Sequence, residues 1–432
     1  MITHLTFENF KSWENTGPIK MGSITGFFGT NSSGKTALLQ FLLMLKQTAE
    51  TTDRNVVLNL GDGRVPVDLG SPQDVLFQHD TRRILKWNLQ WKLPQKLKIY
   101  KPEHENDILF SGDEMGFSAE VTFRQEALKV KSFFYDFAGA QFGMQKKNGH
   151  AEYTLEARHT DFRFKRFPGR KWPITSVVKH YGFSDKVRGY YQNAGFLSDF
   201  ELALEQLMAN IYYLGPLRDY PKREYMWGGN RPTDMGYRGE KVVEAILASR
   251  RAKEKISRGR GRARQTLEEI VAFWLKKLQL IESFSVRPLK RGSKLFSVFV
   301  KRKKDAPEVL ITDVGFGVSQ ILPVLTLCYY VPEGATVILE QPEIHLHPSV
   351  QAGLADVLLD AVQTRKIQII LESHSEHLLQ RLQRRIAEEE IAASDIKLYF
   401  CQTKNKGTSK LIPLQLDLLG NITNWPELTM VH

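Results

Sequence analysis

The sequence predicts an α/β fold, because short apolar runs alternate with longer apolar stretches of helical character. The runs Ile24–Phe28, Ala335–Leu339 and Ile367–Leu371 have the length and composition of buried strands. The stretches Ala37–Leu45 and Ile321–Tyr330 are longer and indicate helices packed against a sheet. Polar or glycine-rich residues follow each strand, so functional side chains are expected at the strand ends.

A phosphate-binding pattern lies between the first strand and the first helix. Residues 29–36 read Gly-Thr-Asn-Ser-Ser-Gly-Lys-Thr, which fits G-x-x-x-x-G-K-T. The glycines let backbone N–H groups turn around a β-phosphate, Lys35 brings a positive charge to the β- and γ-oxygens, and Thr36 offers a hydroxyl to Mg²⁺. We therefore expect ATP and Mg²⁺ as cofactors. The residues expected to bind the nucleotide here are Gly29, Asn31, Ser33, Gly34, Lys35 and Thr36.

Two later segments carry side chains that a triphosphate site needs. Glu340 ends the run Ala335–Leu339, where nucleotide-binding proteins place a carboxylate that holds Mg²⁺ through water, so Thr36 and Glu340 are the expected metal ligands. A small glycine-rich loop opens the stretch Ile321–Tyr330, and such a loop at a helix start is a second anion site. Its expected nucleotide-binding residues are Gly315, Gly317, Ser319 and Gln320.

The order of these parts resembles the head of ABC-type ATPases. Within that class it resembles the branch of chromosome-maintenance, recombination-repair and OLD (overcoming lysogenization defect) ATPases. The matching motifs are F-E-N-F-K-S at 7–12, G-x-N-x-S-G-K-T at 29–36, E-Q-P-E-x-H-L-H-P at 340–348 and E-S-H-S at 372–375. Residues 213–218 (Y-L-G-P-L-R) and 424–426 (N-W-P) resemble a bacterial subgroup of predicted ATPases whose C-terminal part has no assigned function. The resemblance covers both ends of the chain well and the middle poorly.

The resemblance implies a two-lobed head that holds nucleotide between two copies of the chain. The glycine loop before Ser319 in one copy then reaches the γ-phosphate bound by the other copy, and His374 contacts that phosphate. The chain carries a single set of motifs, so a composite site needs a second chain, most simply in a two-fold homodimer. Lys35 and Ser319 are 284 positions apart (319 minus 35), much farther than in transporter heads, which argues against a transporter role.

The function expected from this resemblance is ATP binding and hydrolysis by a homodimer. Closure around ATP would be coupled to nucleic-acid binding or to control of a partner effector in anti-phage defence. Relatives carry or accompany nucleases, but the segment after His374 is too short for a fused nuclease domain, so the effector is expected to be a separate nuclease or toxin. Two other functions stay open: a slow or non-hydrolysing scaffold that sequesters a toxin, and a clamp in DNA recombination or repair.

The residue after Glu340 departs from the usual ABC pattern, which has an acidic residue there to polarise the attacking water. Gln341 occupies this position. An amide orients water but accepts no proton, and proton acceptance is typically worth about 10² to 10⁴ in rate. Either Glu343 acts as the base, or hydrolysis is slow and the protein is an ATP-held clamp. The expected catalytic residues are Glu340, Gln341, Glu343 and His374.

Several other polar residues have more than one interpretation. His345 and His347 are interpreted as part of a loop at the dimer interface, because H-x-H without further ligands is a weak metal signal. Gln73 and Gln78 are both candidates for the glutamine that couples Mg²⁺ to lobe rotation. Arg218 either reaches a phosphate or forms a structural ion pair.

The expected organisation is an ATPase head interrupted by a long middle region. Its parts are ATPase lobe I at 1–80, a β-rich extension of that lobe at 81–196, a helical, strongly basic insertion at 197–305, and ATPase lobe II at 306–432. Alternating residues predict strands at Ile84–Tyr100, Phe117–Arg124 and Tyr153–Phe167, and no sustained heptad pattern predicts a coiled coil. The aromatic cluster at 133–142 is interpreted as core and not as a stacking platform.

Basic residues are concentrated in one part of this middle region. Residues 250–304 contain 18 Lys and Arg against four Glu, a net charge of +14, while the whole chain of 432 residues carries +12. A localised basic strip favours a polyanion such as DNA or RNA, although a solvated loop or an acidic partner protein stays open. The expected nucleic-acid contacts are Arg258, Arg260, Arg262 and Arg264.

Composition predicts a cytoplasmic protein. Cys328 and Cys401 lie in apolar stretches and indicate buried thiols in a reducing compartment. The alternating N-terminal residues lack the shape of a signal peptide and indicate a strand. No stretch reaches the roughly 18 consecutive apolar residues that a membrane span needs.

Overall fold

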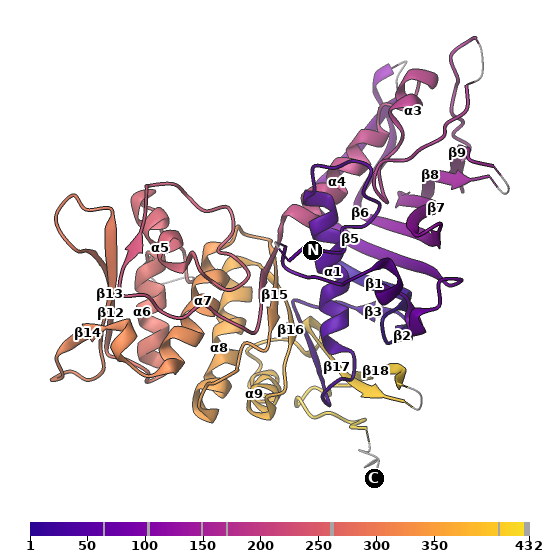
Figure 1. The fold of residues 1–432 in the computed structure, drawn as a ribbon. Helices are drawn as coiled ribbons and strands as arrows, with labels where there is room; N and C mark the ends of the chain where they lie inside the picture. Colours follow the sequence, from indigo (N-terminus) through magenta and orange to yellow (C-terminus); the bar gives the residue numbers. More distant parts are fainter. Residues whose placement is uncertain are drawn as a thin grey trace. The chain divides into compact units, whose positions relative to one another are not determined.

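The computed structural model describes residues 1–63, 65–101, 104–147, 150–169, 172–259, 263–404 and 407–426. The chain, drawn in Figure 1, divides into two compact units. Unit 1 contains residues 1–21, 30–211 and 401–411, and unit 2 contains residues 22–29, 212–400 and 412–432. Within the described ranges, no helix has both the length and the apolar character needed to cross a membrane.

Unit 1 is built around an antiparallel sheet of eight strands, in the order β2-β1-β5-β6-β7-β8-β9, with β3 paired to β1. These strands are β1 (Ile2–Phe10), β2 (Trp13–Asn15), β3 (Ile19–Lys20), β5 (Ile84–Lys101), β6 (His104–Arg124), β7 (Ala127–Phe137), β8 (Ala140–Lys146) and β9 (Tyr153–Arg158). Apolar side chains at alternate positions share one face. Helices α1 (Lys35–Glu50) and α4 (Leu197–Ala209) pack on that face, with the Phe41 ring 4.3 Å from Phe7 and the Phe200 ring 5.4 Å from Phe137. The connecting segments contain α2 (Pro72–Val75), η1 (Phe77–His79) and α3 (Asp185–Tyr190).

Two of the three strands predicted in this unit are confirmed, and the third is shorter than predicted. β5 and β6 include the predicted segments 84–100 and 117–124. β9 ends at Arg158 and does not continue to Phe167, because its partner β8 begins at Ala140, next to the residue paired with Arg158. The aromatic cluster at 133–142 is buried core, as expected.

A six-stranded sheet, in the order β10-β15-β16-β4-β17-β18, forms the centre of unit 2. Its strands are β10 (Ile211–Leu214), β15 (Thr336–Glu340), β16 (Gln368–Glu372), β4 (Ile24–Gly29), β17 (Ile396–Thr403) and β18 (Ser409–Leu414). Strands β15, β16 and β4 are parallel, and their register pairs Glu340 with Glu372 and Glu372 with Phe27. The carboxyl ends of the three strands therefore meet at one edge of the sheet, the usual place for a ligand in α/β proteins.

Helices and a second sheet cover this centre. The helices are α5 (Val242–Arg251), α6 (Leu267–Lys277), α7 (Phe316–Tyr330), α8 (Pro348–Arg365) and α9 (Glu376–Ala387), with short turns η2 (Ile311–Asp313) and η3 (Ala393–Asp395). In the second sheet, β13 (Leu295–Lys301) pairs with β11 (Tyr225–Met226), β12 (Ser283–Pro288) and β14 (Glu308–Leu310). Figure 1 shows the second sheet, α5 with α6, α7 with α8, and the central sheet as successive layers. One buried hydrophobic cluster runs through these layers, with Ile246, Trp274, Leu325, Leu358 and Leu371 among its members.

The predicted domain boundaries differ from the observed units. Segment 197–305 is not a separate insertion, because α4 belongs to unit 1 and residues 212–305 belong with 306–400 in unit 2. The apolar faces of α5 and α6 are buried in the same cluster as α7, so this segment has no core of its own. Residues 22–29, predicted within lobe I, also belong to unit 2, because β4 pairs with β16.

Candidate nucleotide site

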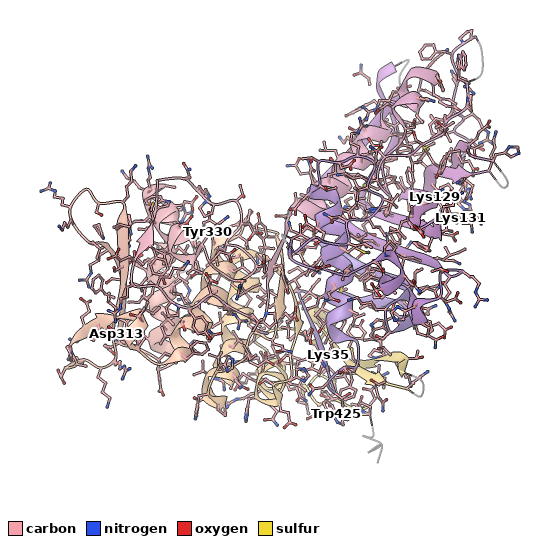
Figure 2. The ribbon with its side chains drawn as sticks, in the orientation of Figure 1. Lys35, Lys129, Lys131, Asp313, Tyr330 and Trp425 are labelled. Carbon is pink, nitrogen blue, oxygen red and sulfur yellow. The ribbon has the colours of Figure 1, made fainter. Side chains whose placement is uncertain are left out.

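The strand, loop and helix expected of a phosphate loop are formed. β4 ends at Gly29, and α1 begins at Lys35, which is labelled in Figure 2. The connecting backbone is left-handed at Ser32, with φ of 57°, and at Gly34, with φ of 89°. Left-handed residues next to right-handed ones form the backbone concavity in which N–H groups bind an anion.

Gly34 allows a close approach that any side chain would prevent. A Cβ atom there would lie 2.4 Å from Ser409 Oγ, 2.8 Å from Ser12 Oγ and 2.9 Å from Trp13 Nε1. Trp13 Nε1–H donates to Gly34 O at 3.0 Å, and Ser409 Oγ donates to Ser12 Oγ at 2.7 Å. The glycine is therefore required by its neighbours as well as by its φ angle.

The polar groups of the loop fit a bound phosphate. Lys35 is 3% exposed, and its ammonium donates to Thr30 O at 2.6 Å, so the charge is held within the loop. Asn31 is exposed and Ser33 is buried. The first turn of α1 has no acidic residue and no side-chain cap, so its N–H groups and helix dipole favour an anion. Thr36, in this first turn, is placed in the chain where a hydroxyl ligand to Mg²⁺ belongs.

Unit 2 gathers acidic and hydroxyl side chains at the carboxyl edge of its sheet, whereas Thr30–Thr36 belong to unit 1. The Tyr213 hydroxyl donates to Glu340 Oε2 at 2.7 Å. Burial raises the pKa of Glu340, and the hydrogen bond from Tyr213 and the charge of Arg218 offset part of that rise. Burial also raises the pKa of Tyr213, so its hydroxyl keeps its proton.

A carboxylate oriented in this way suits Mg²⁺, which usually takes one or two protein carboxylates and keeps several waters. The parts of the chain that the structure describes contain no cluster of three or more His, Cys, Asp or Glu that could hold a metal. This is compatible with magnesium, because such a site does not need a cluster of that size.

The loop after β15 is bonded to the segment after β16. Gln341 has a left-handed φ of 44°, and its N–H donates to Glu372 O at 2.9 Å. Glu343 is buried, and its Oε1 accepts from Ser373 Oγ at 2.8 Å and from the His374 N–H at 2.7 Å. Glu343 Oε2 is buried and has no hydrogen-bond partner among the described residues. Glu343 thus anchors the segment that carries the exposed His374 and keeps one oxygen for a further donor.

His345 and His347 have structural contacts of their own. His347 caps α8 and accepts at Nδ1 from the Ser349 N–H at 3.3 Å. The His345 ring lies 5.3 Å from the Phe316 ring, in an edge-to-face contact. A role of this loop at a dimer interface stays a prediction.

The second glycine loop differs from the prediction. α7 begins at Phe316, so Ser319 and Gln320 lie inside the helix and are buried. Ser319 Oγ donates to Phe316 O at 2.7 Å. Contact of these two side chains with a nucleotide stays a prediction. Gly315 is exposed, and a Cβ there would meet no atom within 4 Å. Contact of Gly315 and Gly317 with a nucleotide bound by a second copy stays a prediction.

The predicted nucleic-acid residues have different environments. Arg258 forms an ion pair with Asp360 at 2.9 Å, with the Arg258 side chain only 4% exposed, and its guanidinium lies 4.2 Å from the centre of the Phe273 ring. The expected phosphate contact by Arg258 is therefore wrong, because a buried arginine paired with an aspartate is not presented to a polyanion. Arg260 and Arg262 lie outside the described residues, and Arg264 is exposed.

Sequence reasoning does not identify Tyr213, although it is the residue that orients Glu340. The available signal is its position in Y-L-G-P-L-R at the end of an apolar run. Gln73 and Gln78 are both exposed, so the choice between them stays open.

A family model matches part of the chain. Residues 208–380 match a family model described as "AAA domain, putative AbiEii toxin, Type IV TA system". This segment includes Glu340, Gln341, Glu343 and His374, but not the phosphate loop at 29–36. Over this segment the chain is similar to AAA-type ATPases. A comparison with curated proteins gave no match.

The solved structures that resemble this chain include three Smc heads. One is an Smc head bound to the C-terminal winged-helix domain of ScpA, with TM-score 0.47, 12% identity, and coverage of 96% of this chain and 98% of that chain. The Smc head domain from Thermotoga maritima gives a TM-score of 0.43 at 11% identity. The match covers 96% of this chain and 99% of that chain. An Smc head with an extended coiled coil, bound to the C-terminal domain of ScpA from Pyrococcus furiosus, gives a TM-score of 0.43 at 10% identity. The match covers 96% of this chain and 96% of that chain.

Proposed function

We propose that the chain is a Mg²⁺-dependent ATPase that closes as a homodimer around ATP. The phosphate loop carries this proposal, because it combines left-handed backbone, a buried Lys35 and an uncapped helix start, and all three favour phosphate. The match of residues 208–380 to an AAA family supports it independently, since the loop lies outside the matched segment.

In the proposed reaction, a water oxygen bonds to the γ-phosphorus while the bond to the β,γ-bridging oxygen breaks, giving ADP, inorganic phosphate and a proton. Mg²⁺ held by Thr36 and Glu340 would neutralise charge on the phosphate oxygens. Glu343 Oε2 is the proposed acceptor for the water's proton, because it has no other donor among the described residues and the Gln341 amide cannot take the proton. Gln341 orients the water, and His374 contacts the γ-phosphate.

Control of a separate effector is the role we propose for ATP-driven closure, in anti-phage defence. The description of the matched family names a putative toxin of a type IV TA system, which supports a defence-related role, and the effector is proposed to be a nuclease or a toxin. Exposed Arg264 supports a nucleic-acid contact on unit 2. A scaffold that only sequesters a toxin would bind ATP without turnover, and a repair clamp would show turnover stimulated by DNA.

Steady-state ATP turnover of the purified chain tests this function, with Lys35→Ala as the blank. We expect wild-type turnover above the blank and loss of ATP binding in Lys35→Ala, because the charge at the β- and γ-oxygens is removed. The matched control is Lys129→Ala, which removes a lysine of β7 (Figure 2) that donates to Gln125 and should leave turnover unchanged. Unchanged ATP affinity in Lys35→Ala would contradict the site, and bound ATP without turnover would contradict hydrolysis.

A further inference from the structure

Arg218 is a buried cation in the loop after β10. The residue is 5% exposed and belongs to unit 2, as do the carboxyl ends of β15 and β16. Its Nη2 donates to Gln341 O at 3.4 Å, which is long for a hydrogen bond. Gln341 follows Glu340 directly in the chain. The guanidinium therefore lies beside the residue proposed to orient the attacking water.

Most of this guanidinium has no partner within the described part of the chain. Nε and Nη1 are both buried without a hydrogen bond. A guanidinium carries five N–H donors in a planar fork, and burying such a charge without partners is costly. The unpaired donors thus indicate that this position binds a group with acceptor oxygens.

The nearby carboxylates do not satisfy Arg218. Burial lowers the pKa of Arg218 to about 10, against the opposing charges of Glu343 and Glu340, so the side chain is still a cation at neutral pH. Glu340 accepts from Tyr213, and Glu343 accepts from Ser373 and the His374 N–H. In the described ranges, neither carboxylate comes close enough to Arg218 to form an ion pair.

We propose that Arg218 is a catalytic residue that donates to the terminal phosphoryl oxygens of the bound nucleotide. This inference rests on the proposed ATPase function. A phosphoryl group matches the free donors, because its oxygens accept two N–H bonds from one guanidinium. The same edge of the sheet contains the end of β4, which continues directly into the phosphate loop. Charge that develops on the phosphoryl oxygens during hydrolysis is then stabilised by an arginine of the same chain.

The test compares wild type with Arg218→Ala, Arg218→Gln and Arg218→Lys. The control is Arg384→Ala, which removes an exposed arginine of α9 paired with Glu388. Three quantities are measured: ATP affinity, kcat, and the affinity for ADP with and without aluminium fluoride, which mimics the phosphoryl group in transfer.

We expect Arg218→Ala to keep its ATP affinity and to lower kcat by about 100-fold or more. The preference for ADP with aluminium fluoride over ADP alone should fall by a similar factor. Arg218→Lys should recover only part of kcat and part of the aluminium fluoride preference, because an ammonium lacks the planar fork of N–H donors of a guanidinium. Arg384→Ala should match wild type.

If Arg218→Ala prefers ADP with aluminium fluoride as strongly as wild type does, the inference is overturned. The role of Arg218 is then structural, through its hydrogen bond to Gln341 O. If Arg218→Ala does not fold, Arg218→Gln decides by the same criterion, since its side chain fills more of the space. A wild-type chain that binds ATP but shows neither turnover nor the aluminium fluoride preference overturns this inference and the hydrolysis step, while ATP binding stands. A wild-type chain that binds no ATP overturns the proposed function and this inference with it.

Discussion

The Glu340 carboxylate is under two opposing influences. Burial raises its pKa, while the hydrogen bond from Tyr213 and the positive charge of Arg218 lower it. A metal binds the ionised carboxylate, so protons and Mg²⁺ compete for Glu340. The balance between burial and the Tyr213 hydroxyl therefore sets the lowest pH at which the proposed metal site is filled.

Tyr213→Phe should move the acid limb of ATP turnover to higher pH. The variant removes the hydrogen bond that lowers the pKa of Glu340 and leaves the burial that raises it. Loss of a hydrogen bond to the ionised carboxylate favours its protonated form, so Glu340 keeps its proton to higher pH in the variant. The measurement is kcat/KM against pH, with Tyr330→Phe as the control, because that hydroxyl donates to Pro232 O. An acid limb at the same pH in Tyr213→Phe and wild type would contradict this role.

At the scale of secondary-structure elements, buried and partly buried polar contacts join three helices of unit 2. Trp274 Nε1–H of α6 donates to the Tyr329 hydroxyl of α7 at 2.7 Å, and that hydroxyl donates to Asp360 of α8 at 2.5 Å. Arg258 donates to the other oxygen of Asp360 at 2.9 Å. In a low-dielectric interior such contacts strengthen one another and fix the helices relative to each other.

Arg258→Ala should lower the stability of the protein, whereas Arg264→Ala should weaken nucleic-acid binding. Removing Arg258 takes away a guanidinium that pairs with Asp360 and packs on the Phe273 ring, which should lower the free energy of unfolding by about 1–3 kcal/mol. Removing exposed Arg264 should leave stability unchanged and reduce the salt dependence of nucleic-acid binding. Urea unfolding followed by tryptophan fluorescence, and DNA binding at several salt concentrations, measure the two effects. Equal stability of the two variants would show that Arg258 is not a structural residue.

This pair of arginines also shows how far the sequence predicts the fold and the site. The strand, loop and helix around Lys35 are local patterns, and they are found where the sequence predicts them. The contact of Arg258 with Asp360 spans 102 positions, and that of Tyr213 with Glu340 spans 127. No periodicity encodes such contacts, because tertiary packing decides which apolar faces meet. The basic run therefore looks like a uniform surface strip in the sequence, although it contains a buried arginine.

At the scale of the whole molecule, the chain has a single phosphate loop and a single second glycine loop. The start of α7 is an exposed surface with aromatic residues around it. The Phe316 ring lies 5.8 Å from Tyr220 and 5.3 Å from His345, and Tyr220 is 75% exposed. Exposed aromatic side chains beside open glycine backbone suit a protein partner, and the composite-site proposal makes that partner a second copy of this chain.

Gly315→Glu should abolish the ATP-dependent dimer without abolishing ATP binding by the monomer. Gly315 has an ordinary φ of −60°, and a Cβ there would meet no atom within 4 Å, so the substitution should not disturb the fold. A carboxylate at this position would repel the phosphates bound by the second copy. Light scattering with a non-hydrolysable ATP analogue measures the dimer, and Gly315→Ala, which adds no charge, is the control. A full dimer in Gly315→Glu would place the start of α7 outside the interface. If Gly315→Ala also loses the dimer, steric crowding at the interface, and not repulsion of phosphate charge, is the cause of the loss.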